Sequence, residues 1–264
     1  MPEFLQTGLV RTAYECTGSG PAIVLMHGAE ANRQMFSSLR ELLSSRMTVI
    51  AYDQRDCGET QCPDHPATLA DLADDAAALI RGLGHQRVHV FGSSFGGRVA
   101  QALAAQHTDL VEKLVLGSTW PLPHSLKELN PEGVARMEAL RKLLPESAEE
   151  LAELFFPEPF LEQRPELRRV FSHVQPSDAR SQRRQITVHS SIRMDWACLR
   201  MPVLLVAGEL DQVVPPGLTL SMAEKLEHSE QVLLSGVGHA TALQAPELLA
   251  NHLTRFLTAE HPAH

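Results

Sequence analysis

The sequence predicts an α/β fold with a mostly parallel central sheet flanked by helices, and three observations carry that prediction. Short continuous apolar runs such as 22–26 and 48–52 do not alternate with polar residues, which is typical of strands buried on both faces. Segments with the apolar spacing of amphipathic helices separate these runs. A strand, a tight turn and a helix are indicated over 88–105. Repeated alternation of strands and helices requires crossover connections and therefore parallel pairing.

The same patterns give each element in order. Strands are expected at the apolar or β-branched runs, which are 4–10, 13–17, 22–26, 48–52, 88–92, 113–117, 202–207 and 231–234. The first two strands are expected to turn at Arg11-Thr12. Helices around the sheet are expected where apolar residues recur with helical spacing, which are 35–43, 67–82 with its start near Thr68, 99–105, 217–228 and 245–258.

The segment 120–195 interrupts this alternation. It contains helix-like stretches with prolines between them, at 131–143, 147–156, 160–172 and 178–192. We therefore expect residues 1–119 and 196–264 to form one core domain, with 120–195 inserted between two sheet strands as a helical cap, or lid. Because open α/β sheets place their sites at the carboxyl ends of the strands, the cap is expected to cover that edge.

Composition excludes several classes of function. The 264 residues carry a formal net charge of −9, whereas nucleic-acid binding requires a basic surface. No apolar run approaches the roughly 20 residues that span a bilayer, and Met1-Pro2-Glu3-Phe4 lacks the features of a signal peptide, so a cytoplasmic protein without membrane contact is expected. The cysteines form no CxxC pair, so reduced thiols and no metal site are expected at Cys16, Cys57, Cys62 and Cys198.

Arginines cluster in the predicted cap. Such a cluster favours an anionic substrate if it faces the site, but charged runs of this kind more often form a solvated helix face. The arginines are Arg164, Arg168, Arg169, Arg180, Arg183 and Arg184.

The stretch Gly92-Ser93-Ser94-Phe95-Gly96 has the Gly-x-Ser-x-Gly pattern of a nucleophile elbow. Ser94 lies at the centre of the glycine frame and is the predicted nucleophile. In such an elbow the serine adopts a strained conformation, and its small neighbours let the strand and the helix approach closely. The helix start offers unpaired N–H groups, so the backbone N–H of Phe95 is the first predicted oxyanion donor.

A serine nucleophile needs a base, and the base needs an acid that orients it. His239 is the predicted base because it lies in a glycine-containing loop between the last strand and the last helix. Asp211 follows the strand 202–207, at the same edge of the sheet as the elbow, and is the predicted acid. Glu209 is an alternative acid. No carboxylate follows the strand 113–117, which adds weight to Asp211.

The loop after the strand 22–26 is predicted to supply the second oxyanion donor. Gly28 allows a tight turn there, so that the backbone N–H of Ala29 can face the site, while His27 is expected to stabilise the turn. Glu30 could orient a polar substrate or simply pair with Arg33. Candidate residues of an apolar pocket, which could equally be plain core, are Phe36, Trp120, Leu122, Phe155, Phe156 and Phe160.

Together these features resemble the α/β-hydrolase superfamily, most closely its small-molecule esterase and enol-lactonase members. The matching features occur in the family's order, which is His27-Gly28, the loop 53–58, the elbow 92–97, the segment 208–211 and Gly238-His239. The order of Ser94, Asp211 and His239 is also that of the family. The resemblance covers roughly 15–118 and 200–258. One departure is that Asp56-Cys57 replace the glycine often found in the family's Arg-Gly-x-Gly loop.

The resemblance implies a cofactor-free hydrolase that cleaves a small-molecule carboxylic ester or lactone through an acyl-enzyme on Ser94. It leaves the oligomeric state open between monomer and homodimer. The same fold also occurs in lyases, perhydrolases, cofactor-free dioxygenases and small-molecule receptors, which fold alone does not separate from esterases. A non-hydrolytic protein that uses the same pocket therefore stays as the alternative.

Overall fold

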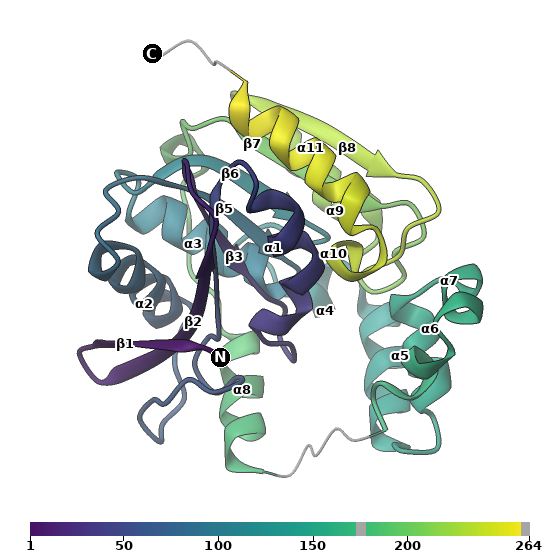
Figure 1. The fold of residues 1–264 in the computed structure, drawn as a ribbon. Coiled ribbons are helices and arrows are strands. Elements are labelled where there is room, and N and C mark those ends of the chain that lie inside the picture. The colour runs from purple at the N-terminus through teal and green to yellow at the C-terminus, as the bar shows by residue number, and fades with distance from the viewer. Residues whose placement is uncertain (173–177, 260–264) are drawn as a thin grey trace.

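A single sheet of eight strands organises residues 1–172 and 178–259, the part of the chain that the computed structural model describes (Figure 1). The strand order is β1-β2-β4-β3-β5-β6-β7-β8. The strands are β1 (Glu3–Thr7), β2 (Val10–Thr17), β3 (Ala22–Met26), β4 (Thr48–Tyr52), β5 (Val88–Ser93), β6 (Val111–Gly117), β7 (Val203–Gly208) and β8 (Ser229–Leu234). Every pairing from β4 to β8 across this order is parallel, which confirms the predicted sheet.

The first hairpin differs from the prediction. β1 and β2 are antiparallel and turn at Gly8-Leu9 rather than at Arg11-Thr12. A two-residue hairpin turn favours positive φ, which Gly8 adopts at 58° without a steric penalty. Arg11 and Thr12 are therefore free to pair with β1.

Helices cover both faces of the sheet (Figure 1). Alternate residues of β3 point to opposite faces, so that Val24 packs with α2 and α3, and Ile23 with α1 and α11. A capping box between Thr68 and Asp71 starts α2 where the sequence predicts. The helices of the sheet region are α1 (Ser37–Leu43), α2 (Leu69–Gly82), α3 (Phe95–Gln106), α9 (Pro216–Leu220), α10 (Thr241–Gln244) and α11 (Pro246–Thr258).

Two predicted helices each divide into a short α-helix and a 3₁₀ turn. The stretch 217–228 divides into α9 and a 3₁₀ turn over Ser221–Lys225, and it ends before β8, which begins at Ser229 and pairs with β7. The stretch 160–172 divides into α7 and a 3₁₀ turn over Pro165–Arg169, since Pro165 has no N–H to continue the helix.

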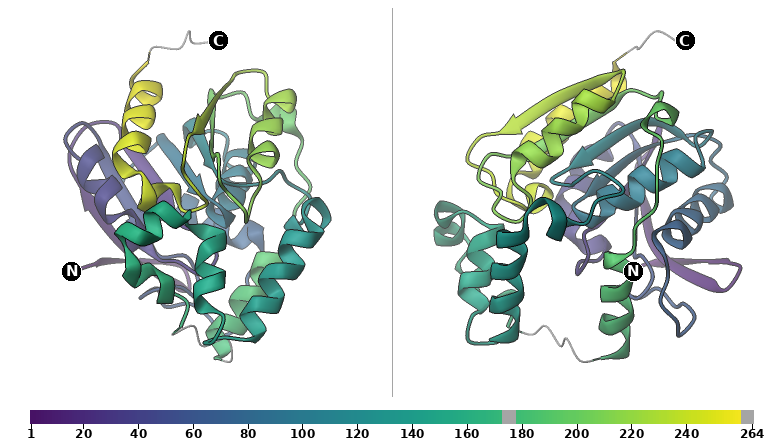
Figure 2. Two further views of the ribbon diagram at one scale, coloured as in Figure 1. Left: turned by 90° about the vertical axis from the view of Figure 1, so that its right-hand side faces the viewer. Right: turned by 180° about the vertical axis from the view of Figure 1, so that it is seen from behind.

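The segment between β6 and β7 is helical and gathers beside one end of the sheet (Figure 2). Its helices are α4 (Leu126–Leu129), α5 (Pro131–Lys142), α6 (Ala148–Phe155), α7 (Glu158–Gln163) and α8 (Ala179–His189). We call residues 120–195 the inserted segment. Leu140 and Leu151 of this segment pack in one apolar cluster with Val213 and Val214, which follow β7. The inserted segment thus rests on the loop that carries Asp211.

None of the helices in the described residues combines the length and the apolar character that a bilayer span requires.

Candidate active site

Ser94 lies at a sharp turn between β5 and α3. Its backbone has φ 56° and ψ −122°, a conformation that L residues rarely adopt. The neighbouring glycines are needed because the chain is crowded there. A Cβ atom at Gly92 would collide with the carbonyl oxygen of Gly96, and one at Gly96 would collide with that of Met26. The turn has the strand-to-helix geometry of a nucleophile elbow.

His239 and Asp211 meet Ser94 at the carboxyl edge of the sheet. Nε2 of His239 lies 3.0 Å from Oγ of Ser94, and Nδ1 lies 2.8 Å from Oδ2 of Asp211. The other oxygen of Asp211 accepts hydrogen bonds from the backbone N–H groups of Val213 (2.9 Å) and Val214 (2.8 Å). These bonds fix the carboxylate, so that it can hold the imidazole in one orientation.

The alternative acid, Glu209, lies away from the imidazole. Its carboxylate accepts hydrogen bonds from the hydroxyl of Ser235 (2.7 Å) and the backbone N–H of Gly236 (2.9 Å). Both contacts lie on an exposed loop, and they lower the pKa of Glu209. Glu209 therefore braces the loop that leads to His239 and does not touch the histidine itself.

The inserted segment also reaches His239. The backbone N–H of His239 donates to the carbonyl oxygen of Phe155 at 2.9 Å, and the ring of Phe155 stands edge-on to the imidazole with the centroids 5.4 Å apart. These contacts place the end of α6 over one side of the imidazole.

The loop after β3 passes directly beside Ser94. A Cβ atom at Gly28 would lie 3.6 Å from Cβ of Ser94, so only a short distance separates the two backbones. Gly28, Ala29 and Phe95 all border the same cavity as Ser94. Ala29 and Phe95, whose backbone N–H groups are the predicted oxyanion donors, are thus close to Ser94.

The buried side chain of His27 stabilises this loop through two hydrogen bonds to backbone groups. Its Nε2 accepts a hydrogen bond from the backbone N–H of Gln54 (3.0 Å), so its Nδ1–H donates to the carbonyl oxygen of Gly28 (2.8 Å). Complete burial and the nearby charge of Arg184 lower the pKa of His27 to about 3. His27 is therefore neutral at pH 7 and acts as a structural residue of the turn.

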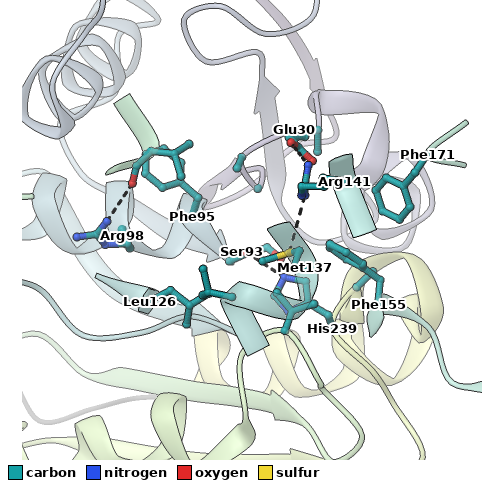
Figure 3. A pocket seen from close by; sticks show the side chains of 18 of the residues that line it. Glu30, Ser93, Phe95, Arg98, Leu126, Met137, Arg141, Phe155, Phe171 and His239 are labelled. Carbon is teal, nitrogen blue, oxygen red and sulfur yellow. Dashed lines mark hydrogen bonds and ion pairs between the residues drawn. The ribbon is translucent and has the colours of Figure 1, made fainter. Parts of the chain in front are cut away.

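A cavity of about 440 Å³ opens beside Ser94 and His239. Figure 3 shows His239 among the side chains that line it. The lining is mostly apolar and comes from the loop after β3, from α3 and from the inserted segment. Of the predicted pocket residues, Glu30, Trp120, Phe155 and Phe156 line it. Apolar residues that sequence reasoning missed include Met35, Leu126, Val134, Met137, Val170, Phe171 and Leu243.

Three predicted pocket residues lie elsewhere. Phe36 is buried in the core, edge-on to Phe91 with the ring centroids 5.9 Å apart. Leu122 is fully buried in the core that surrounds α3. Phe160 packs against Phe156, with the ring centroids 5.8 Å apart, and does not line the cavity. Aromatic and aliphatic composition alone did not separate pocket from core.

Glu30 does not pair with Arg33. It forms an ion pair with Arg141 of α5 (Figure 3). It also accepts a hydrogen bond from Gln185 of α8 (3.2 Å), so it joins the loop after β3 to two helices at the cavity wall. Arg33 is buried and instead pairs with Asp53 and Glu59. The carboxylate of Asp53 also accepts a hydrogen bond from the backbone N–H of Arg33, at 2.8 Å.

The arginine cluster does not line the cavity. Arg164 and Arg168 pair with glutamates of the inserted segment. Arg183 of α8 binds the carboxylate of Asp56 at 3.0 and 2.7 Å. Asp56 has φ 59°, which explains why glycine is common at this position, and its side chain attaches α8 to the sheet region.

Within the described residues, the lysine and arginine side chains that border the cavity are Lys127, Arg98 and Arg141. Arg98 is almost fully buried beside Trp120, with its guanidinium carbon 5.3 Å from the ring centroid. It donates to the carbonyl oxygens of Val188 and Ser190, so it holds the end of α8 against α3. No group of three or more side chains suited to hold a metal ion occurs in the described residues.

Comparison with known proteins shows the family. The chain matches the family model of the alpha/beta hydrolase fold over residues 21–246. It is 29% identical to the putative carbamate hydrolase RutD of Caulobacter sp. (strain K31), over 97% of this chain and 99% of that protein.

Two solved structures are similar over nearly the whole chain. A thermophilic esterase from Thermogutta terrifontis has a TM-score of 0.80 and 26% identity, covering 97% of this chain and 98% of that one. The enol-lactonase from Burkholderia xenovorans LB400 has a TM-score of 0.82 and 23% identity, covering 97% and 100%. At 23% identity, the similarity to the enol-lactonase is a similarity of fold alone.

Proposed function

The chain belongs to the α/β-hydrolase family, and we propose that it is a serine hydrolase that cleaves a small-molecule carboxylic ester or lactone through an acyl-enzyme on Ser94. The observation that carries the proposal is the chain of contacts from Asp211 through His239 to Ser94, at 2.8 and 3.0 Å. This is the arrangement by which a histidine base activates a serine hydroxyl.

In the first half of the reaction, Oγ of Ser94 attacks the substrate carbonyl carbon while Nε2 of His239 takes the hydroxyl proton. The carbonyl oxygen becomes negative and accepts hydrogen bonds from the N–H groups of Ala29 and Phe95. Each such donor contributes about 10²–10³ in rate, because it binds the oxyanion more strongly than the neutral carbonyl.

The first half ends when His239 gives its proton to the leaving alcohol, and the acyl group stays on Ser94. In the second half, His239 takes a proton from the water that attacks the acyl carbonyl, and it returns that proton to Oγ of Ser94 as the acid leaves. Asp211 stabilises the imidazolium that forms in both halves and keeps its own charge.

The cavity favours a small, largely apolar substrate. Its volume of about 440 Å³ lies within the range of small-molecule sites. Glu30 and Arg141 neutralise each other at its wall, so the pair attracts neither anions nor cations strongly. We propose that the inserted segment is the cap of this site, and that residues 1–119 and 196–264 are the core domain on which it rests.

The test is the rate of hydrolysis over a panel of p-nitrophenyl esters of increasing acyl length, lactones and amides. Ser94→Ala should lower the rate on every accepted substrate, by about 10⁶ if the site behaves as other triads do. The matched control is Ser221→Ala, an exposed serine after α9, which should leave the rate unchanged. Hydrolysis by Ser94→Ala at the wild-type rate would contradict the proposal, and a lyase or receptor would cleave no member of the panel.

A further inference from the structure

We propose that Arg184 of α8 is a positioning residue for the oxyanion hole. Its guanidinium holds the backbone of residues 28 and 29 so that the N–H of Ala29 faces the nucleophile. The inference rests on the proposed function, and it adds that a residue of the inserted segment completes the oxyanion hole of the sheet region.

Arg184 reaches across from α8 to the loop after β3. Its Nε–H donates to the carbonyl oxygen of Ala29 at 2.8 Å, and one Nη2–H lies at the limit of a hydrogen bond, 3.5 Å from the carbonyl oxygen of Gly28. Nη2 also donates to the side-chain oxygen of Gln54 at 2.8 Å. The residue is only 4% exposed, so water competes little for these contacts.

The orientation of a peptide carbonyl fixes the orientation of its N–H. In a trans peptide the two groups point in opposite directions, and the N–H of Ala29 shares its peptide with the carbonyl of Gly28. That carbonyl faces both His27 and Arg184. The N–H of Ala29 therefore points away from them, on the side where Gly28 adjoins Ser94.

The charge of Arg184 adds to this geometric effect. A cation at the carbonyl end of a peptide polarises the group and makes the N–H end a better partner for a negative oxygen. The guanidinium carbon also lies 4.8 Å from the ring centroid of Phe95, whose backbone N–H is the other proposed donor. Arg184 thus contacts both residues that would bind the oxyanion.

The partners of Arg184 set it apart from its neighbours on α8. Within the described residues no carboxylate lies at ion-pair distance from it, whereas Arg183 binds the carboxylates of Asp56 and Asp64. Arg180 donates to backbone carbonyls of the loop 57–60, and neither Arg180 nor that loop lines the cavity. Both of those arginines attach the helix through contacts outside the cavity lining. A buried cation with only neutral oxygen partners is costly, which points to a role beyond attachment.

The experiment compares Arg184→Ala with Arg183→Ala, its matched control one residue away on the same helix. With p-nitrophenyl acetate as substrate, Arg184→Ala should lower kcat by about 10- to 100-fold, with KM changed less than about threefold, because the lost interaction strengthens only in the transition state. Arg183→Ala should keep kcat within about threefold. Arg184→Lys retains the charge without the fork of donors and should restore part of the rate.

A second readout separates positioning from folding. Phenylboronic acid forms a tetrahedral adduct with the nucleophile, so its inhibition constant should rise in Arg184→Ala by the same factor as kcat/KM falls. If Arg184→Ala does not fold, Arg184→Lys takes its place in both measurements, and an unchanged kcat and inhibition constant in that variant would overturn the proposal.

Equal losses of kcat in Arg184→Ala and Arg183→Ala, with equal losses of Tm, would also overturn it, because Arg184 would then only attach α8. These failures differ from failure of the proposed function. In the latter case the wild-type protein would show no hydrolysis that depends on Ser94, and both proposals would fall together.

Discussion

The hydroxyl of Thr119 donates a hydrogen bond of 2.7 Å to the carbonyl oxygen of Ser94. Thr119 follows β6, and its own N–H and carbonyl both bind the hydroxyl of Thr219, at 3.0 and 2.7 Å. The strained backbone of Ser94 is thereby tied to two neighbouring segments of the sheet edge. A residue in a rare conformation persists only when its surroundings hold it in this way.

We expect Thr119→Val to destabilise the protein by about 1 kcal/mol, since the substitution keeps the shape but removes the hydroxyl donor to the carbonyl of Ser94, which keeps the N–H of Gly97 as a donor. The measurement is the free energy of unfolding in urea. The matched control is Thr258→Val, whose hydroxyl binds an exposed carbonyl at the end of α11 and which should change stability by no more than about 0.5 kcal/mol. Equal stabilities for both variants would show that the elbow does not depend on Thr119.

Asp211→Asn should lower kcat by about 10³–10⁴-fold while the protein stays folded. The asparagine oxygen can still accept the N–H groups of Val213 and Val214, so the amide nitrogen then faces Nδ1 of His239. This favours the wrong tautomer, with the proton on the nitrogen that should accept from Ser94. Steady-state hydrolysis measures the loss.

Glu209→Gln is the control for this substitution, because Glu209 lies two residues away and binds Ser235 and Gly236. It should change kcat by less than about threefold. The opposite pattern, with Glu209→Gln inactive and Asp211→Asn active, would assign the acid to Glu209.

His27 should make the protein less stable in acid. Its pKa falls from 6.5 to about 3 on folding, so the unfolded chain binds a proton between these values and the folded chain does not. Above about pH 6.5 His27 therefore does not lower the free energy of unfolding. As the pH falls from there towards 3, the free energy of unfolding decreases by up to about 1.4 kcal/mol per pH unit.

Urea unfolding between pH 4 and pH 6 tests this contribution. His27→Gln removes the titrating group. The slope of its free energy of unfolding against pH should therefore be smaller than that of the wild type by about 1.4 kcal/mol per pH unit, the value for one proton. The variant should be less stable at pH 7, because it loses the contacts to Gly28 and Gln54. Parallel curves for the two proteins would refute the assignment.

Glu30→Gln should shift specificity towards anionic esters. The side chains of Glu30 and Arg141 are 26% and 27% exposed, and the substitution leaves Arg141 unneutralised at the cavity wall. A partly exposed charge pair contributes about 0.5–1 kcal/mol, so kcat/KM for p-nitrophenyl hemisuccinate relative to p-nitrophenyl butyrate should rise about two- to fivefold.

The control is Glu247→Gln, at the start of α11, which should leave this ratio unchanged. High salt should reduce the gain in Glu30→Gln, since it screens partly exposed charges. A ratio that does not change in Glu30→Gln would mean that Arg141 does not meet the substrate.

The sheet was predictable from the sequence because its strands are signalled locally. The runs 22–26 and 48–52 are strands at these bounds. Because the carboxyl ends of parallel strands meet at one edge of the sheet, the positions of Ser94, Asp211 and His239 after their strands predicted that they lie close together. Gly8 and Pro165 are also local signals, for the hairpin turn and for the helix break, but the predicted strand 4–10 and the predicted helix 160–172 extended across them.

The cavity lining was not predictable in the same way. Whether Phe36 or Phe155 faces the cavity depends on how the inserted segment packs on the sheet, and helical spacing shows which residues share a face but not what that face meets. The same holds for Glu30, whose partner Arg141 is distant in sequence. It also holds for Arg184, because a run of arginines indicates a solvated helix face, whereas the side chain of Arg184 contacts Gly28 and Ala29.

The measurement that bears most directly on the proposed function is labelling with a fluorophosphonate probe, followed by mass spectrometry of the labelled peptides. Fluorophosphonates react with serine hydroxyls that a neighbouring base activates. Wild-type protein should label rapidly at Ser94, Ser94→Ala should not label, and His239→Ala should label at least about 10²-fold more slowly because the base is lost. Absence of labelling in the wild type, or equal labelling in Ser94→Ala, would contradict the assignment of Ser94 as the nucleophile.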